Sequence, residues 1–127
     1  MLFYILLFCD VQGQSDSTNI TDFTKLLQGA FSESDNKDWQ SANHQWQKIT
    51  SINPTEGEFW YKLGESYYYS GNFKKAIDVF DSSLHIGSPP YEGAYFITKA
   101  YAALNDKGQT LNWLQKSFDL ADRNLFY

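Results

Sequence analysis

A helical hairpin that recurs every 34 residues constrains the fold of this chain more than any other feature of its sequence. The clearest copy spans residues 60–84 (WYKLGESYYYSGNFKKAIDVFDSSL) and divides into two helical patterns at Gly71. In each half the apolar residues recur at steps of three and four, which places them on one face of a helix. Gly71 can adopt a positive φ at little cost, and Asn72 can cap the second helix. One such hairpin cannot bury both of its faces alone.

The pattern is repeated on both sides of the central hairpin without a gap. Steps of 34 residues connect Leu63 with Ile97, Tyr67 with Tyr101, Phe80 with Trp46, and Ala76 with Ala42. Chance periodicity rarely keeps its register through both helices, so we divide residues 23–124 into three units, 23–56, 57–90 and 91–124. Each unit is expected to bury its apolar faces against the neighbouring unit.

The central unit resembles the tetratricopeptide repeat family. Its residues follow the family pattern Trp60-x-x-Leu63-Gly64-x-x-Tyr67, followed by Ala76 and Phe80. The resemblance implies an all-α fold, a right-handed superhelical stack of three antiparallel helix hairpins. The outer units follow the pattern less closely, since Glu33 replaces the tyrosine and Thr98 replaces a small residue.

The repeat also predicts the core of the central unit. The residues expected to be buried are Trp60, Leu63, Tyr67, Ala76, Ile77 and Phe80. Gly64 and Ala76 are expected to face each other, because two small residues allow helices to approach closely.

Local signals indicate where the elements begin and end. A first helix is expected over residues 21–34, and Asp38 is a suitable N-cap for a second helix over residues 39–52. Thr55-x-x-Glu58 predicts a capping box at the start of the central hairpin. The run Ser88-Pro89-Pro90 is expected to separate the second unit from the third.

The N-terminus begins with an unbroken apolar run, residues 2–8. The run has the length of a signal-peptide core, so we predict a signal peptide over residues 1–13 and an extracytoplasmic location, either periplasmic or secreted. The alternative is an apolar tail that docks on the first unit of a cytoplasmic protein. Residues 14–22 contain few apolar groups and are predicted to form a flexible linker.

The C-terminus follows the third unit closely. Solenoids usually end in a capping helix with a polar outer face, whereas residues 125–127 are Leu-Phe-Tyr. We therefore expect an uncapped end, either because the chain is a fragment of a longer protein or because these residues fold back over the last helix. An uncapped third unit would also permit self-association.

Composition and motifs argue against catalysis. The net charge of −5 does not suit a nucleic-acid partner, and the single cysteine, Cys9, cannot form an intrachain disulfide or a cysteine-based zinc site. His44 and His85 have no neighbours at metal-ligand spacing. The sequence contains no phosphate-binding loop, dinucleotide fingerprint or nucleophile elbow. Its apolar runs are also too short to span a membrane. We expect no enzyme activity, cofactor or metal.

The family resemblance implies a peptide-binding groove lined by the first helix of each unit. The groove positions are Leu27, Phe31, Tyr61, Glu65, Tyr68, Tyr95 and Lys99. Tyrosine combines apolar area with a hydroxyl group, which suits such a surface. The alternative for Tyr68 and Tyr69 is that they only pack between neighbouring units.

The sequence therefore predicts a non-catalytic scaffold that binds a protein or peptide of unknown identity. A competing hypothesis is that the chain is the N-terminal repeat region of a larger secreted enzyme or sensor protein. The residues that hold a C-terminal carboxylate in some family members are missing, because only Lys62 is basic among the corresponding positions.

Overall fold

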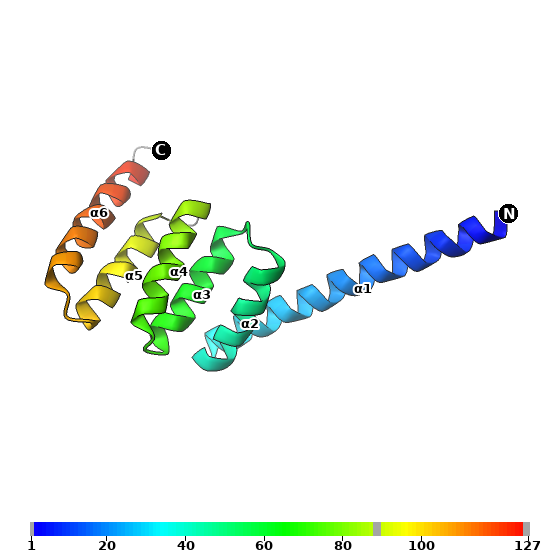
Figure 1. Cartoon of the computed structure of the whole chain (residues 1–127), viewed down its shortest axis with the longest axis horizontal. Coiled ribbons are helices and arrows are strands. Elements are labelled where there is room, and N and C mark those ends of the chain that lie inside the picture. Colours follow the sequence, from blue (N-terminus) through cyan, green and yellow to red (C-terminus); the bar gives the residue numbers. More distant parts are fainter. Residues whose placement is uncertain (1, 88–89, 126–127) are drawn as a thin grey trace.

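The computed structural model describes the backbone of residues 2–87 and 90–125, with side chains from 17 to 87 and 90 to 123. Six α-helices follow one another: α1 (Leu2–Asp35), α2 (Trp39–Ile52), α3 (Gly57–Tyr69), α4 (Phe73–Ile86), α5 (Pro90–Ala103) and α6 (Lys107–Leu125). Over these ranges the chain contains no β-strand, and successive helices pack as neighbours in a single stack (Figure 1). The predicted all-α stack of helix hairpins is confirmed.

Side-chain caps fix the start of two of the second helices. The carboxylate of Asp38 accepts a hydrogen bond from the backbone N–H of Ser41, and the amide oxygen of Asn72 accepts one from Lys75. Gly71 connects the helices of the central hairpin with a φ of 81°, a conformation that favours glycine. These caps agree with the predicted boundaries.

The capping box predicted at Thr55 and Glu58 is wrong. The N-cap of α3 is Glu56, which makes no side-chain capping bond, and the Thr55 hydroxyl donates to Asn53 instead. The helix starts one residue later than the box requires, because Asn53-Pro54 ends α2 and takes up the next residues in the turn.

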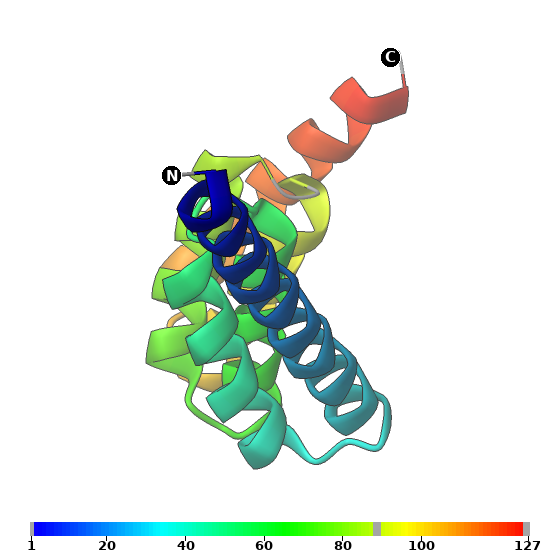
Figure 2. The same ribbon diagram turned by 90° about the vertical axis from the view of Figure 1, so that its right-hand side faces the viewer.

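The helix α1 differs most from its predicted form. Residues 14–22, predicted as a flexible linker, are helical in the structure. The helix α1 projects well beyond the stack in Figure 1 and runs toward the viewer in Figure 2. The hydroxyls of Thr21 and Thr24 donate to carbonyls four residues earlier, so these polar residues satisfy their groups within the helix. Because the anchored part of α1 supplies the nucleus, extending the helix costs little. The signal peptide remains a prediction, and Ser88, Pro89 and residues 126–127 lie outside the described residues.

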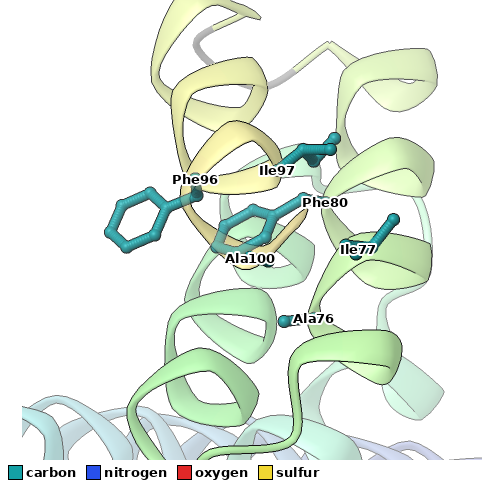
Figure 3. Close-up of a cluster of buried hydrophobic side chains, with 6 residues drawn as sticks. All are labelled: Ala76, Ile77, Phe80, Phe96, Ile97 and Ala100. Carbon is teal, nitrogen blue, oxygen red and sulfur yellow. The ribbon is translucent and has the colours of Figure 1, made fainter. Parts of the chain in front are cut away.

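One buried cluster joins the second hairpin to the third (Figure 3). It contains Ala76, Ile77, Phe80, Phe96, Ile97 and Ala100. The rings of Phe80 and Phe96 stack at a centroid distance of 4.9 Å, so a residue of α4 packs directly on one of α5. Leu63 is buried as predicted, while Trp60 and Tyr67 are only half-buried at the edge of the core.

The nearest neighbour of Gly64 across the central hairpin is Phe80, and the expected contact with Ala76 stays a prediction. A Cβ atom at Gly64 would lie 2.7–2.9 Å from atoms of the Phe80 ring. The glycine thus makes room for an aromatic side chain of α4.

A second cluster joins the first hairpin to the second. Trp46, which is fully buried, lies at its centre with Ala30, Ala42, Ile49 and Leu63. The Trp46 indole N–H donates to the Ser34 hydroxyl at 3.0 Å, which links α2 to α1.

We expect Ser34→Ala to lower the free energy of unfolding by about 1–2 kcal/mol, because it leaves the buried indole N–H without an acceptor. Chemical denaturation measures the change. Ser82→Ala is the control, since the exposed Ser82 hydroxyl bonds only to a carbonyl of its own helix. Equal stabilities for the two variants would show that the indole bond contributes nothing.

Candidate peptide-binding groove

Aromatic rings from α3 and α5 gather around the side chain of Phe96. Tyr61 and Tyr68 both meet Phe96 edge to face, with ring centroids 5.9 and 5.3 Å away. Tyr95 precedes Phe96 on α5 and points outward, with half of its surface exposed. We call the surface formed by Tyr61, Tyr68, Tyr95, Phe96 and Lys99 the aromatic groove.

Lys99 lies against three of these rings. Its Nζ atom is 3.9 Å from the centroid of Phe96, 5.0 Å from that of Tyr68 and 5.1 Å from that of Tyr95. The ring faces attract the ammonium group, while partial burial lowers the pKa of Lys99. The negative charge of Glu65 partly opposes that lowering. The aromatic rings therefore hold the Lys99 ammonium group in a defined place within a largely apolar surface.

Carboxylates lie beside the rings. Glu65 pairs with Lys62 at 2.9 Å, and Glu92 accepts a hydrogen bond from the Tyr91 hydroxyl at 2.9 Å. Burial, followed by the charges of Glu65 and Glu92, raises the pKa of Tyr61. The Tyr61 hydroxyl thus stays protonated at physiological pH and can donate a hydrogen bond.

A pocket of about 300 Å³ opens between α3, α5 and α6. Its walls are Tyr61, Tyr91, Glu92, Tyr95, Phe96, Lys99, Ser117, Phe118 and Ala121. The lining is mainly apolar, with one carboxylate and one ammonium group. Such a cavity fits an apolar side chain of a partner and leaves the charged groups at its edge to set orientation.

The structure brings together five of the seven predicted groove residues. Tyr61, Glu65, Tyr68, Tyr95 and Lys99 are joined through ring contacts or through the electrostatic influence of Glu65. The other two, Leu27 and Phe31, pack in the first hairpin, where Phe31 meets Trp46 edge to face at 4.9 Å. Ring contacts among the described residues do not connect them to the aromatic groove.

The alternative role considered for Tyr68 and Tyr69 has support from their contacts. Tyr69 stacks on Trp39 of α2 at 4.5 Å, and Tyr68 packs against Phe73 as well as Phe96. Tyr61 also serves the core, since its ring lies 5.5 Å from that of Phe80. Among the described residues, Tyr95 makes no ring contact with another aromatic side chain, and its ring lies against Lys99 of its own helix.

Phe96 and the α6 residues of the pocket were missed by sequence reasoning. Phe96 precedes the core position Ile97 by one residue, so it fell outside the predicted stripe. A detectable signal existed, because α5 is apolar on almost every side, with Tyr91, Ala94, Tyr95, Phe96, Ile97 and Ala100. A helix of this kind needs partners on several faces.

Other chemistry is not visible in the described part of the chain. It contains no cluster of three metal-ligating side chains, and none of its helices is long and apolar enough to cross a membrane. His44 and His85 are both exposed, and the Nδ1 atom of His85 lies 2.7 Å from the Asp81 carbonyl oxygen of its own helix.

The fold and the groove together define a helical-repeat solenoid. Residues 57–86, the central hairpin, match the tetratricopeptide repeat family. The central hairpin is therefore a tetratricopeptide repeat, and the predicted resemblance is confirmed. No curated protein sequence matches the chain significantly.

Solved structures with low sequence identity share the fold. MamA aligns over 80% of this chain with 19% identity and a TM-score of 0.76, and PcrH in complex with the chaperone-binding region of PopD aligns over 79% with 13% identity and a TM-score of 0.74. The secretion chaperone SycD of Yersinia enterocolitica, in complex with a peptide of the translocator YopD, aligns over 76% with 13% identity and a TM-score of 0.72. The aligned part amounts to 59% of the MamA chain, 75% of PcrH and 74% of SycD.

Proposed function

We propose that this chain is a non-catalytic scaffold that binds a segment of another protein in the aromatic groove. The pocket between α3, α5 and α6 carries the proposal, because it places exposed tyrosine beside a positioned cation. Tyrosine and tryptophan dominate the binding energy of protein interfaces, since they bury a large area at low entropic cost.

The fold of the chain supports a protein or peptide as the ligand. PcrH and SycD, which share the helical stack, were solved with segments of PopD and YopD bound. The groove has too little positive charge for a polyanion, since Lys62 pairs with Glu65 and the net charge of the chain is −5. An extended or helical peptide needs only an apolar anchor and a few polar contacts.

The groove chemistry indicates what the bound segment carries. We assign the pocket to an apolar side chain, which would pack against Tyr61, Tyr95 and Phe118. A carboxylate on the segment would face Lys99, and Glu92 would disfavour a second acidic residue at the opposite edge.

The substitution Tyr95→Ala tests whether the pocket binds an apolar side chain of the partner. Peptides selected from a displayed library against the full chain provide the probe, and calorimetry measures their affinity. We expect Tyr95→Ala to weaken binding about tenfold, or about 1.4 kcal/mol, because Tyr95 is a half-exposed wall of the pocket. Ile52→Ala is the matched control, since it removes an exposed apolar side chain from α2. Equal losses, or no loss for Tyr95→Ala, would mean that the groove is not the binding surface.

The substitution Lys99→Gln tests whether the Lys99 ammonium group orients the bound peptide by attracting one of its carboxylates. For a selected peptide with an acidic residue, we expect slower association and a weaker response to salt. Lys48→Gln is the control, because it removes the same charge from an exposed position on α2. An unchanged salt dependence for Lys99→Gln would contradict the assignment of Lys99 to a partner carboxylate.

A further inference from the structure

The outer face of α6 exposes apolar side chains at positions that the repeat uses for packing. Leu111 is 67% exposed and Phe118 is 59% exposed. One repeat earlier, Ile77 is 8% exposed and Leu84 packs on the same buried cluster, because α5 covers that side of α4. Figure 1 shows α6 at one end of the stack, and within the described residues α5 is the helix that packs on it. Within the described residues, these two apolar side chains on the outer face of α6 are not covered by another helix.

A second copy cannot easily cover this face by continuing the stack. In α5, the positions that face the preceding hairpin include Gly93, Ile97 and Ala100, all buried. Two repeats earlier, α1 has Lys25, Gly29 and Ser32 at these positions, and Lys25 and Ser32 are exposed. The α1 helix of another copy would therefore bring polar side chains to Leu111 and Phe118.

The outer face of α6 is complementary to itself when two copies run antiparallel. Lys107, Leu111, Phe118 and Asp122 follow at steps of four, seven and four, so they form one stripe along the helix. Placing Leu111 opposite Phe118 of the second copy also places Lys107 opposite Asp122, because both pairs are centred between residues 114 and 115. We propose that two copies of this chain pair through α6 about a twofold axis, with two apolar contacts and two ion pairs.

The positions of the two charges support this pairing. Lys107 is the first residue of α6 and Asp122 lies in its last turn. A cation at the N-terminus and an anion at the C-terminus both oppose the helix macrodipole, so neither charge favours the isolated helix. Each is exposed, and neither has an ion-pair partner within the described residues. A second copy supplies the opposite charge to both.

Two other charged residues of α6 have contacts within the chain. The ammonium group of Lys116 lies 4.3 Å from the centroid of the Trp113 ring, and Asp119 accepts a hydrogen bond from Gln115 at 3.0 Å. Lys116 points away from the stripe and provides a control position. The pairing involves Phe118 and so borders the pocket of the aromatic groove, whereas Leu111 lies outside it.

Sedimentation equilibrium of the full chain at low salt tests the proposal. We expect a dimer in the wild type and a monomer in Leu111→Asp, which puts a charge at the centre of the apolar contact. A wild-type chain that stays monomeric throughout the concentration series overturns the proposal. Association that persists in Leu111→Asp also overturns it, because the contact then lies elsewhere.

Charge reversal distinguishes the antiparallel pairing from any other use of the face. Lys107→Asp and Asp122→Lys should each weaken the dimer roughly ten- to thirtyfold, since two attractions become two repulsions. Both changes favour the α6 macrodipole, so the loss cannot come from a frayed helix. Lys116→Asp makes the same change in net charge as Lys107→Asp and should leave the dimer unchanged.

The two reversals should rescue each other. The double variant restores both ion pairs within a homodimer, and an equimolar mixture of the two single variants restores them in a heterodimer. Recovery in both experiments is the result expected. Single reversals that dimerise like the wild type, or a mixture that does not recover, would rule out the antiparallel register.

Discussion

Replacing Phe80 by Ala is expected to lower the free energy of unfolding by about 3–5 kcal/mol. Phe80 is fully buried, stacks on Phe96 of the next hairpin and is met edge to face by Tyr61. Its removal leaves a cavity at the junction of α3, α4 and α5, which the rigid helices cannot close. Chemical denaturation measures the loss, and hydrogen exchange should show that α5 and α6 open before α2.

Tyr95→Ala is the control for this variant. It also removes an aromatic ring, but from the exposed surface of α5, so its cost should stay below about 1 kcal/mol. Similar losses for the two variants would mean that Phe80 does not hold the second and third hairpins together.

Enlarging Gly64 is expected to have the second largest effect on stability. A Cβ atom at this position would approach the Phe80 ring to 2.7–2.9 Å. Gly64→Leu therefore has to displace Phe80 or separate α3 from α4, and we expect a loss of about 3 kcal/mol or more in the free energy of unfolding. Thermal and chemical denaturation both measure it.

The same substitution at Gly29 provides a matched control of opposite sign. Gly29 lies within α1, and apart from its two chain neighbours and the local helix backbone no atom lies within 4 Å of a Cβ placed there. Leucine has a much higher helix propensity than glycine, so Gly29→Leu should stabilise the protein by up to about 1 kcal/mol. If both substitutions shift the denaturation midpoint in the same direction, close packing at Gly64 is not the cause.

The repeat register was predictable because it depends on local periodicity. Gly71, Asp38 and Asn72 each act through their own backbone or the next turn, and the structure places them as expected. Contacts between helices were less predictable. The pattern identified Gly64 as a site of close approach but could not show that the approaching group is Phe80.

The linker prediction for residues 14–22 failed because the polar composition favours a linker, whereas the neighbouring anchored helix favours a helix. Residues 14–22 are rich in polar side chains, which favours a linker in an isolated segment. In the chain this segment continues a helix that is already anchored by Ala30 and its neighbours in the first core cluster. Propagation of an existing helix is much easier than nucleation.

Only some of the groove residues could be predicted from the sequence. The family resemblance placed Tyr61, Tyr95 and Lys99 on one surface, with Tyr61 and Tyr95 at the same position of successive repeats and Lys99 one turn after Tyr95. It could not show that Tyr61 is shared between the pocket and the core, since that depends on the tilt of α3 against α4. Nor could it add Phe118, which reaches the pocket from a second helix.

The location of the bound segment tests the central proposal most directly. Isotope-labelled protein titrated with a peptide selected from a displayed library reports the contact surface residue by residue through its amide and side-chain resonances. We expect the largest changes at Tyr61, Tyr95, Phe96 and Lys99, with small ones at exposed control residues of α2 such as Ile52. Changes confined to α2 and α4, with the aromatic groove unaffected, would contradict the proposal that the groove is the working surface of this protein.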